Sequence, residues 1–227
     1  MANSTGARLL REATREFAQH GYENTTIDAI AKRVGVTGAA LYRHASSKED
    51  LFCRCVELCN TVFKSRVFDE VEKIDDPYEK VRLLFSNSVR LSIKQPEIPL
   101  LLNHPINHLS AKNRKRFTQK DKDAINFQRD IMAEFIQAHS LDKALDPLLA
   151  LYVVHGTIAW VTRWYAPRQE ADIERLIDET MNILLHGLQG EAAPKQLSLH
   201  QTRDGSHYDF TRRHLVSVPR RTSSRGR

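Results

Sequence analysis

Side chains that can bind the phosphate backbone of DNA are concentrated in residues 37–48. Tyr42 and His44 each carry a polar group on a ring, placed to reach phosphate oxygens. Lys48 adds a cation at a predicted helix N-terminus, where backbone N–H groups also attract phosphate. The small residues at 37–40 would let a helix backbone approach base edges. This pattern favours major-groove DNA binding over the alternative, an ordinary pair of helices packed in a helical domain.

A first short helix must lie just before these residues. Ile27, Ile30, Ala31 and Val34 recur at helical spacing and predict one apolar face. Gly35 follows them, at the position where many helices end in a residue with positive φ. The sequence therefore predicts a helix that stops at Gly35, with a tight turn after it.

Residues suited to capping helices mark the predicted helix starts. Thr25 can cap the first helix, with Asp28 three places on, and Thr37 can cap a second helix over residues 38–44. A serine at 46–47 can cap the next one. Two short helices around a glycine-containing turn make a helix-turn-helix, which places its second helix in the major groove of DNA.

Four segments of this region carry a family resemblance: AQHGY at 18–22, TTIDAIA at 25–31, GVTGAALYRH at 35–44 and SKEDL at 47–51. Together they resemble the DNA-binding domain of the TetR family of transcriptional repressors, over about residues 5–55. The resemblance implies an all-α homodimer with an N-terminal DNA reader and a C-terminal domain for ligand binding and dimerisation. It also implies that ligand binding releases the DNA.

The resemblance further implies which residues touch a palindromic operator in double-stranded DNA. By position, the phosphate contacts are Thr26, Tyr42, His44 and Lys48. The base-facing surface is Thr37, Gly38, Ala39 and Arg43. Thr25, beside Thr26 at the same helix start, is counted with these DNA-binding residues.

Length and charge predict the domain organisation. The 227 residues suffice for one large domain or two modest ones. Of the formal net charge of +6, residues 191–227 hold +5, from eight basic and three acidic side chains. We expect a DNA-binding domain at 1–50, a ligand-binding and dimerisation domain at 51–190, and a basic, disordered tail at 191–227.

The longest uncharged run, residues 147–162, has 16 residues and is shorter than the roughly 20 that a membrane span needs. No apolar N-terminal run suggests a signal peptide. We therefore expect a cytoplasmic protein with no membrane partner.

Beyond the helix-turn-helix, apolar periodicity and prolines predict a series of helices. The helix at 48–71 would begin in the DNA-binding domain and end in the next one, so it is the candidate mechanical link. Residues 98–109 lie among three prolines and form either a mobile gate or a plain connector. The predicted helices, in chain order, cover residues 4–20, 27–34, 38–44, 48–71, 77–94, 113–139, 146–165 and 171–188.

Two of these helices predict a subunit interface. Residues 146–165 are apolar almost all round, so they must be covered on two sides. The helix at 171–188 is amphipathic. Together they predict a four-helix homodimer interface. In the helix at 113–139, Asp121 and Gln128 interrupt the apolar face, either as a polar pocket wall or as a drift of the stripe.

One stretch of the second domain suggests an effector. GTIAWVTRWYAP at 156–167 resembles the end of the corresponding helix in TetR-type regulators that sense acyl-CoA thioesters. An apolar pocket would take the acyl part, Trp160 and Trp164 would stack on adenine, and Arg163 would pair with phosphate. Tyr152 joins this small hydrophobic effector site. The alternatives are core or dimer-interface roles for the tryptophans, and an efflux regulator that responds to a drug-like hydrophobic molecule.

Other classes of protein fit less well. The sequence has no Gly-rich phosphate loop, HExxH motif or nucleophile elbow, so we expect neither an enzyme nor a cofactor. A sequence-blind architectural binder working through the basic tail would leave the large apolar domain unexplained. The cysteines crowd into one helix and are expected to pack in the core rather than bind a metal: Cys53, Cys55 and Cys59. Coincidence is favoured over a metal site for His200, His207 and His214.

Overall fold

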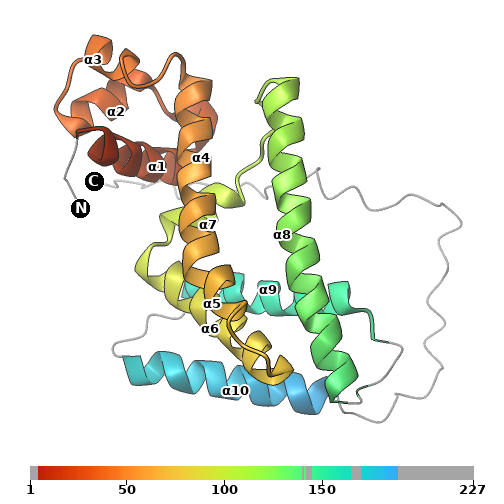
Figure 1. Cartoon of the computed structure of the whole chain (residues 1–227). Helices are drawn as coiled ribbons and strands as arrows, with labels where there is room; N and C mark the ends of the chain where they lie inside the picture. Colours follow the sequence, from red (N-terminus) through yellow and green to blue (C-terminus); the bar gives the residue numbers. More distant parts are fainter. Residues whose placement is uncertain (1–4, 140, 142–144, 165–169, 189–227) are drawn as a thin grey trace, which may run out of the picture. The chain divides into compact units, whose positions relative to one another are not determined.

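The computed structural model describes residues 5–139, 141, 145–164 and 170–188 (Figure 1). Every regular element in these ranges is helical, which confirms the predicted all-α class. The predicted tail, with its three histidines, lies outside the described residues. All described residues belong to the first of two compact units, residues 1–193. Across them, none of the helices combines the length and apolarity that crossing a membrane requires.

Three helices at the N-terminus form what we call the head: α1 (Thr5–Asn24), α2 (Ile27–Val34) and α3 (Gly38–Tyr42). The first helical stretch breaks at Gly21, whose φ of 77° and ψ of 167° are not helical, so it ends at residue 20 as predicted, and a short helical segment continues to Asn24 beyond the kink. The face of α1 that packs inward is set by Leu9, Ala13 and Phe17, each at most 2% exposed. The half-buried Leu10 lies at the edge of this face.

The cap of α2 corrects one prediction. Thr26, not Thr25, is the N-cap, and its hydroxyl accepts a hydrogen bond from the backbone N–H of Ala29 at 3.1 Å. Thr25 is 1% exposed, and its hydroxyl donates to the carbonyl of Gly21 at 2.7 Å. The shift of one residue follows from burial: Thr25 closes the end of α1, so the next threonine is left to start α2. Gly35 ends α2 in the left-handed region, as predicted.

A long helical run leaves the head. The predicted single helix at 48–71 is continuous in direction but consists of α4 (Lys48–Phe63), a π-helical segment η1 (Lys64–Phe68) and α5 (Asp69–Val71). Ser47 caps its start by accepting from the backbone N–H of Asp50. Its cysteines are free and buried, as expected for core residues, and burial raises the pKa of both Cys55 and Cys59 to about 12.

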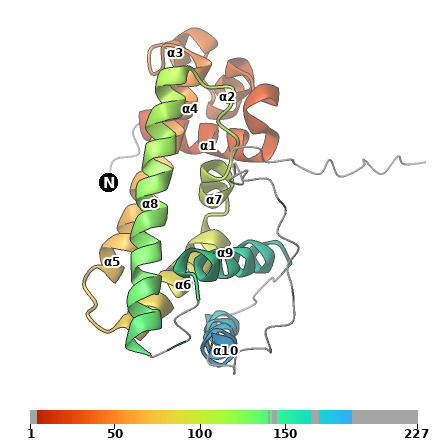
Figure 2. The same ribbon diagram turned by 90° about the vertical axis from the view of Figure 1, so that its right-hand side faces the viewer.

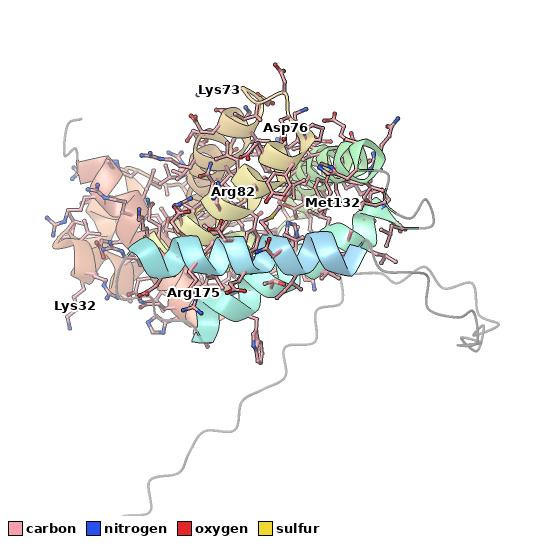
Figure 3. All side chains as sticks on the ribbon, turned by 90° about the horizontal axis from the view of Figure 1, so that it is seen from below. Lys32, Lys73, Asp76, Arg82, Met132 and Arg175 are labelled. Atoms are coloured by element: carbon pink, nitrogen blue, oxygen red, sulfur yellow. The ribbon has the colours of Figure 1, made fainter. Side chains whose placement is uncertain are left out.

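The C-terminal domain, as we call residues 77–188, is built around α6 (Pro77–Lys94), with Asp76 as the predicted N-cap. It also contains α7 (Glu97–Leu102), α8 (Ala111–Ala138), α9 (Pro147–Trp164) and α10 (Glu170–Leu188). Helix α6 contacts each of α8, α9 and α10, so it is the central element (Figure 2). At the end seen in Figure 3, Arg82 of α6 pairs with Asp178 of α10 at 3.2 Å.

Helix α7 lies between the two regions rather than at the surface of one. It packs against α1 and α4 of the N-terminal part. Its apolar side chains Ile98 and Leu101 are 4% and 1% exposed. This packing favours the connector interpretation of residues 98–109 over a mobile gate.

Candidate nucleic-acid interface and effector site

The exposed face of the head is formed by α3 and the starts of the neighbouring helices. Tyr42 is 54% exposed, and Gly38 and Lys48 are half-buried. The remaining predicted DNA-binding residues on this surface are exposed: Thr26, Thr37, Ala39, Arg43 and His44. The buried Thr25 is the exception, so it has no side-chain surface to offer to DNA.

Local hydrogen bonds and close packing hold α3 in place. Thr37 caps it by accepting from the backbone N–H of Ala40 at 3.1 Å. A Cβ at Gly38 would come within 2.9 Å of the Asp28 carboxylate of α2, so glycine allows the two helices to approach. Leu41 is completely buried and anchors α3 from below. Helix α3 ends at Tyr42, two residues earlier than predicted.

The turn that follows α3 is fixed by one carboxylate. Asp50 accepts a hydrogen bond from the backbone N–H of Ser46 at 2.8 Å and another from Arg54 at 3.1 Å. The bond from Ser46, followed by the one from Arg54, holds the pKa of the Asp50 carboxyl below its ordinary value. The turn carrying Arg43 and His44 is therefore tied to the first turn of α4.

Lys48 is held where α1 ends and α4 begins. Its ammonium donates to the carbonyl of Glu23 at 3.2 Å and lies 4.4 Å from the centre of the Tyr22 ring. An ammonium has three N–H donors, and these contacts leave capacity for a phosphate oxygen. The geometry thus presents a positioned cation at the edge of the exposed head surface.

Behind Lys48 lies a cluster that we call the joint: Tyr22 and Phe52 from the N-terminal part, and His104 and His108 from the segment between α7 and α8. The rings of Tyr22 and His108 stack with centroids 3.8 Å apart and 17° between planes. Phe52 meets the His108 ring edge-on at 5.0 Å. Among the described residues, the buried Nε2 of His108 has no hydrogen-bond partner.

A carboxylate completes the link between the two regions. Glu49 of α4 accepts from the backbone N–H of Ser110 at 2.9 Å and from the side chain of Asn113 at 2.7 Å. The bond from Asn113 is the main reason why the pKa of Glu49 lies below its ordinary value. Burial lowers the pKa of His108. The start of α8 is therefore attached to the start of α4.

The C-terminal domain holds a buried polar pair. His155 of α9 and Gln128 of α8 are 2.8 Å apart through Nε2 and Oε1. The Gln128 amide N–H₂ donates to the carbonyl of Ala124, so its oxygen is the acceptor and His155 is the donor. Burial lowers the pKa of His155, which favours the neutral ring. Gln128 is 5% exposed, while Asp121 is exposed, so only one of the two predicted wall residues points inward.

A small cavity of about 210 Å³ lies between α5, α6 and α8. Val71, Phe127 and Ile131 give it an apolar floor. Its rim carries Lys80 and three carboxylates, from Glu72, Asp130 and Glu134. The cavity borders the helical run that starts in the head, but its acidic rim does not suit phosphate groups.

Helix α9 presents an apolar stripe to solvent. Leu149, Val153 and Trp160 are 63%, 64% and 66% exposed, at spacings that place them on one face. Trp160 therefore shares a face with aliphatic side chains, which favours the dimer-interface alternative for it. Tyr152 lies half-buried at the edge of that face. The side chains of Arg163 and Trp164 lie outside the described residues.

Comparison with known proteins identifies the family. Residues 9–55 match the bacterial regulatory proteins of the tetR family. Residues 75–188 match the tetracyclin repressor-like C-terminal domain, and this match alone covers half of the 227 residues. The chain belongs to the TetR family. It is a DNA-binding transcriptional repressor and not an enzyme.

Other TetR-type proteins resemble it along most of its length. The fatty acid metabolism regulator protein of Bacillus subtilis (strain 168) is 23% identical over 182 residues, which cover 80% of this chain and 94% of that protein. A crystal structure of AibR in complex with isovaleryl coenzyme A and operator DNA has a TM-score of 0.70 at 22% identity, covering 80% and 98% of the two chains. The FadR structure from Bacillus subtilis in complex with stearoyl-CoA has a TM-score of 0.61 at 23% identity, with the same coverage.

Sequence reasoning found the reading surface of this TetR protein but missed the joint and the histidine of the buried pair. The signal for the joint was His104 and His108, four residues apart after α7. The signal for the pair was His155, the one histidine of the largely apolar segment at 146–165. Neither signal names its partner, because Tyr22 and Gln128 are brought close only by the fold.

Proposed function

We propose that this TetR-family repressor binds a palindromic operator as a homodimer and is released by an acyl-CoA. One observation carries the effector part: the fold is shared, at a TM-score of 0.70, with a regulator whose structure contains isovaleryl coenzyme A and operator DNA. The stearoyl-CoA complex of FadR supports the same ligand class with a longer acyl chain.

In the proposed DNA complex, α3 enters the major groove. Its N-terminal residues Thr37, Gly38 and Ala39 are small and face solvent or lie half-buried, so base edges can approach the backbone. Arg43, just after α3, reaches a base edge. The phosphate contacts are made by the exposed Thr26, Tyr42 and His44, together with Lys48.

The apolar stripe of α9 supports the homodimer. Side chains that are more than 60% exposed and aliphatic or aromatic are costly to leave in water, and a second copy of the same face would cover them. A two-fold dimer reads two half-sites, which is why we propose a palindromic operator. Leu184, on α10, is a further proposed interface position, although its side chain lies outside the described residues.

A negative charge in the stripe tests the dimer. Val153→Glu would place a carboxylate in the interface and should yield monomer by light scattering. Gln137→Glu, at an exposed position of α8, adds the same charge away from the stripe and should leave a dimer. A Val153→Glu protein that remains dimeric would show that the subunits meet elsewhere.

The cavity beside α5 is the proposed entry point for the acyl chain. Phe127, which lines the cavity, contacts Phe68 of η1 with ring centroids 4.9 Å apart and the rings tilted by 54°, so an acyl group would insert between α8 and the run that leads to the head. A volume of about 210 Å³ is below the roughly 300–1,000 Å³ of typical ligand pockets, so the helices must separate on binding. The phosphates of the coenzyme would lie outside the cavity, on the side away from its acidic rim. Arg163 is their proposed partner.

Release then requires that the ligand bind one arrangement of the two heads better than the other. A shift of α5 and η1 would be carried along α4, and a shift of α8 would be carried through Glu49. Both routes end at the first turn of α4, next to Lys48.

A release assay tests the proposal. An operator is first selected from a random duplex pool, and the bound protein is then titrated with acyl-CoAs of increasing length, the matching free acids and coenzyme A alone. We expect release by a subset of the thioesters, weakened by Phe127→Ala through the acyl site and by Arg163→Ala through the phosphates. Equal release by acid and thioester would replace the acyl-CoA with a generic hydrophobic effector, as in an efflux regulator.

A further inference from the structure

Helix α8 reaches from the C-terminal domain to the level of the reading head. It has 28 residues, which is about 42 Å at 1.5 Å per residue. Figures 1 and 2 show its first turns beside the start of α4, at the same end of the molecule as α3. The hydrogen bonds from Ser110 and Asn113 to Glu49 fix this placement. The start of α8 is thus next to Lys48, a proposed phosphate contact.

This end of α8 is strongly basic. Residues 111–122 contain six Lys or Arg side chains and one carboxylate, Asp121. Two of the cations, Arg116 and Lys120, face α4 and pair with Glu57. A third, Arg114, donates to the carbonyl of Asn107 at 3.1 Å and holds the preceding loop.

The remaining cations of this end are Lys112, Lys115 and Lys122. Lys112 and Lys115 are exposed. In the part of the chain that the structure describes, neither ammonium takes part in an ion pair or hydrogen bond. Lys115 lies on the side of α8 away from α4, and Lys112 lies one turn before Arg116, at the edge of the face that meets α4. Helical side chains lean toward the helix N-terminus, here the end level with α3. Lys115 lines an open hollow on α8 together with Arg114, Thr118, Gln119 and Lys122, and Lys112 follows Ala111, another residue of its lining.

We propose that Lys112 and Lys115 bind the phosphate backbone of the same DNA duplex that α3 reads. The occupant is DNA because the side chains of this face are cationic or polar, apart from Ala111, and because the face adjoins the reading head. The inference rests on DNA binding by the head but adds a contact from the C-terminal domain. Helix α8 then lines the cavity at one end and holds DNA at the other, so a movement of α8 would weaken binding directly.

Salt-dependent binding of the full-length protein tests this contact. The test protein carries Lys112→Gln and Lys115→Gln. The control carries Lys73→Gln and Arg129→Gln, which remove the same charge from exposed pairs elsewhere (Lys73 is labelled in Figure 3). Each is titrated against the selected operator and a random 40-bp duplex over a range of salt. Removing a phosphate contact flattens the slope of log affinity against log salt by about 0.9.

We expect a flatter slope for the test protein on both duplexes, with its ratio of operator to random affinity unchanged, and little change for the control. Hydroxyl-radical footprints should lose protection at a few backbone positions and keep the rest. Equal slopes for test and control would overturn the contact while leaving operator binding by the head intact. If the unmodified protein selected no operator, that result would instead count against the proposed reading head. If only the test protein lost its preference for the operator over the random duplex, α8 would position the head or read bases, and the proposed backbone contact would be wrong.

Discussion

The head and the C-terminal domain are both helical, but different interactions hold them together. In the head, two short helices are each started by a threonine hydroxyl that bonds a backbone N–H three residues on. In the C-terminal domain, the helices have 18 to 28 residues, apart from α7, and depend on contacts between distant parts of the chain. The Arg82–Asp178 pair, for example, joins residues 96 apart. Local hydrogen bonds therefore fix the short helices of the head, whereas the C-terminal domain is held together by contacts between helices that are distant in the chain.

This difference suits a regulator. A DNA-reading surface must keep its shape. Short helices do so when their first turns are capped and when a glycine, here Gly38, lets them pack closely. A domain that admits a ligand must separate its helices, and a cavity bordered by α5, which directly follows the π-helical segment η1, offers a place to begin. The joint of Tyr22, Phe52, His104 and His108 lies at the contact between the head and the segment that leads into α8.

The largest expected effect comes from emptying one core position in each region. Leu41 and Leu151 are both completely buried, so Leu→Ala at either should lower the free energy of unfolding by about 2–5 kcal/mol in urea titrations. Leu41 is the buried residue of α3, so only its loss should also weaken operator binding strongly at temperatures where both variants are folded. Equal losses of DNA affinity would show that the head does not keep its shape independently.

The next effect separates two residues of the reading surface. Arg43→Ala should reduce discrimination at one base pair per half-site by about 1–3 kcal/mol. Tyr42→Ala should weaken binding to all duplexes alike, because phosphate contacts carry no sequence information. Competition binding against single-base operator variants measures both. Unchanged base preference in Arg43→Ala would remove it from the base readers.

A smaller effect compares one helix cap from each region. Thr37 caps α3, and Asp76 caps α6 by accepting from the backbone N–H of Glu79 at 2.9 Å. Replacing either by Ala should cost about 0.5–2 kcal/mol of stability. Thr37→Ala should in addition lower operator affinity, while Asp76→Ala should not. If Asp76→Ala weakened DNA binding as much, local capping would not explain the shape of the head.

The difference between local and long-range interactions also explains which features of the structure the sequence predicts. The turn at Gly35, the cap at Thr37 and the start at Pro77 are set by residues within a few positions, and all three are confirmed. Local sequence patterns gave a wrong prediction where contacts with another helix determine the structure. Burial of Thr25 against α1 moved the cap of α2 to Thr26, because two adjacent threonines look alike in sequence.

The candidate sites divide in the same way. The exposed residues of α3 follow from helical periodicity and the family resemblance. Trp160 could be placed on α9 but not assigned to pocket or interface, since periodicity gives a face without naming what covers it. The proposed division at residue 50 and the roles of Arg163 and Trp164 stay predictions.

The smallest expected effect uses two partly buried histidines, His108 in the joint and His155 in the C-terminal domain. Burial lowers the pKa of His108 and of His155 below the ordinary 6.5, so near pH 6.5 each ring is protonated less in the folded protein than in the unfolded chain. Below that pH the unfolded chain binds protons that the folded chain does not, so stability should fall as the pH is lowered from about 7.5 to 5.5. At His108, charges from His104 and Lys48 add to the lowering, while Glu23 and Glu49 oppose it.

Replacing the two rings separates their roles. His108→Gln and His155→Gln should each flatten the dependence of unfolding free energy on pH, and the double variant should flatten it most, because fewer groups then take up protons on unfolding. Of the two histidines, only His108 stacks on Tyr22, and the ring of Tyr22 contacts the Lys48 ammonium. Operator affinity should change between pH 7.5 and 5.5, and only His108→Gln should reduce that change. Urea titrations and anisotropy at three pH values measure both quantities. An undiminished pH response of DNA binding in His108→Gln would show that the joint does not carry protonation to the head.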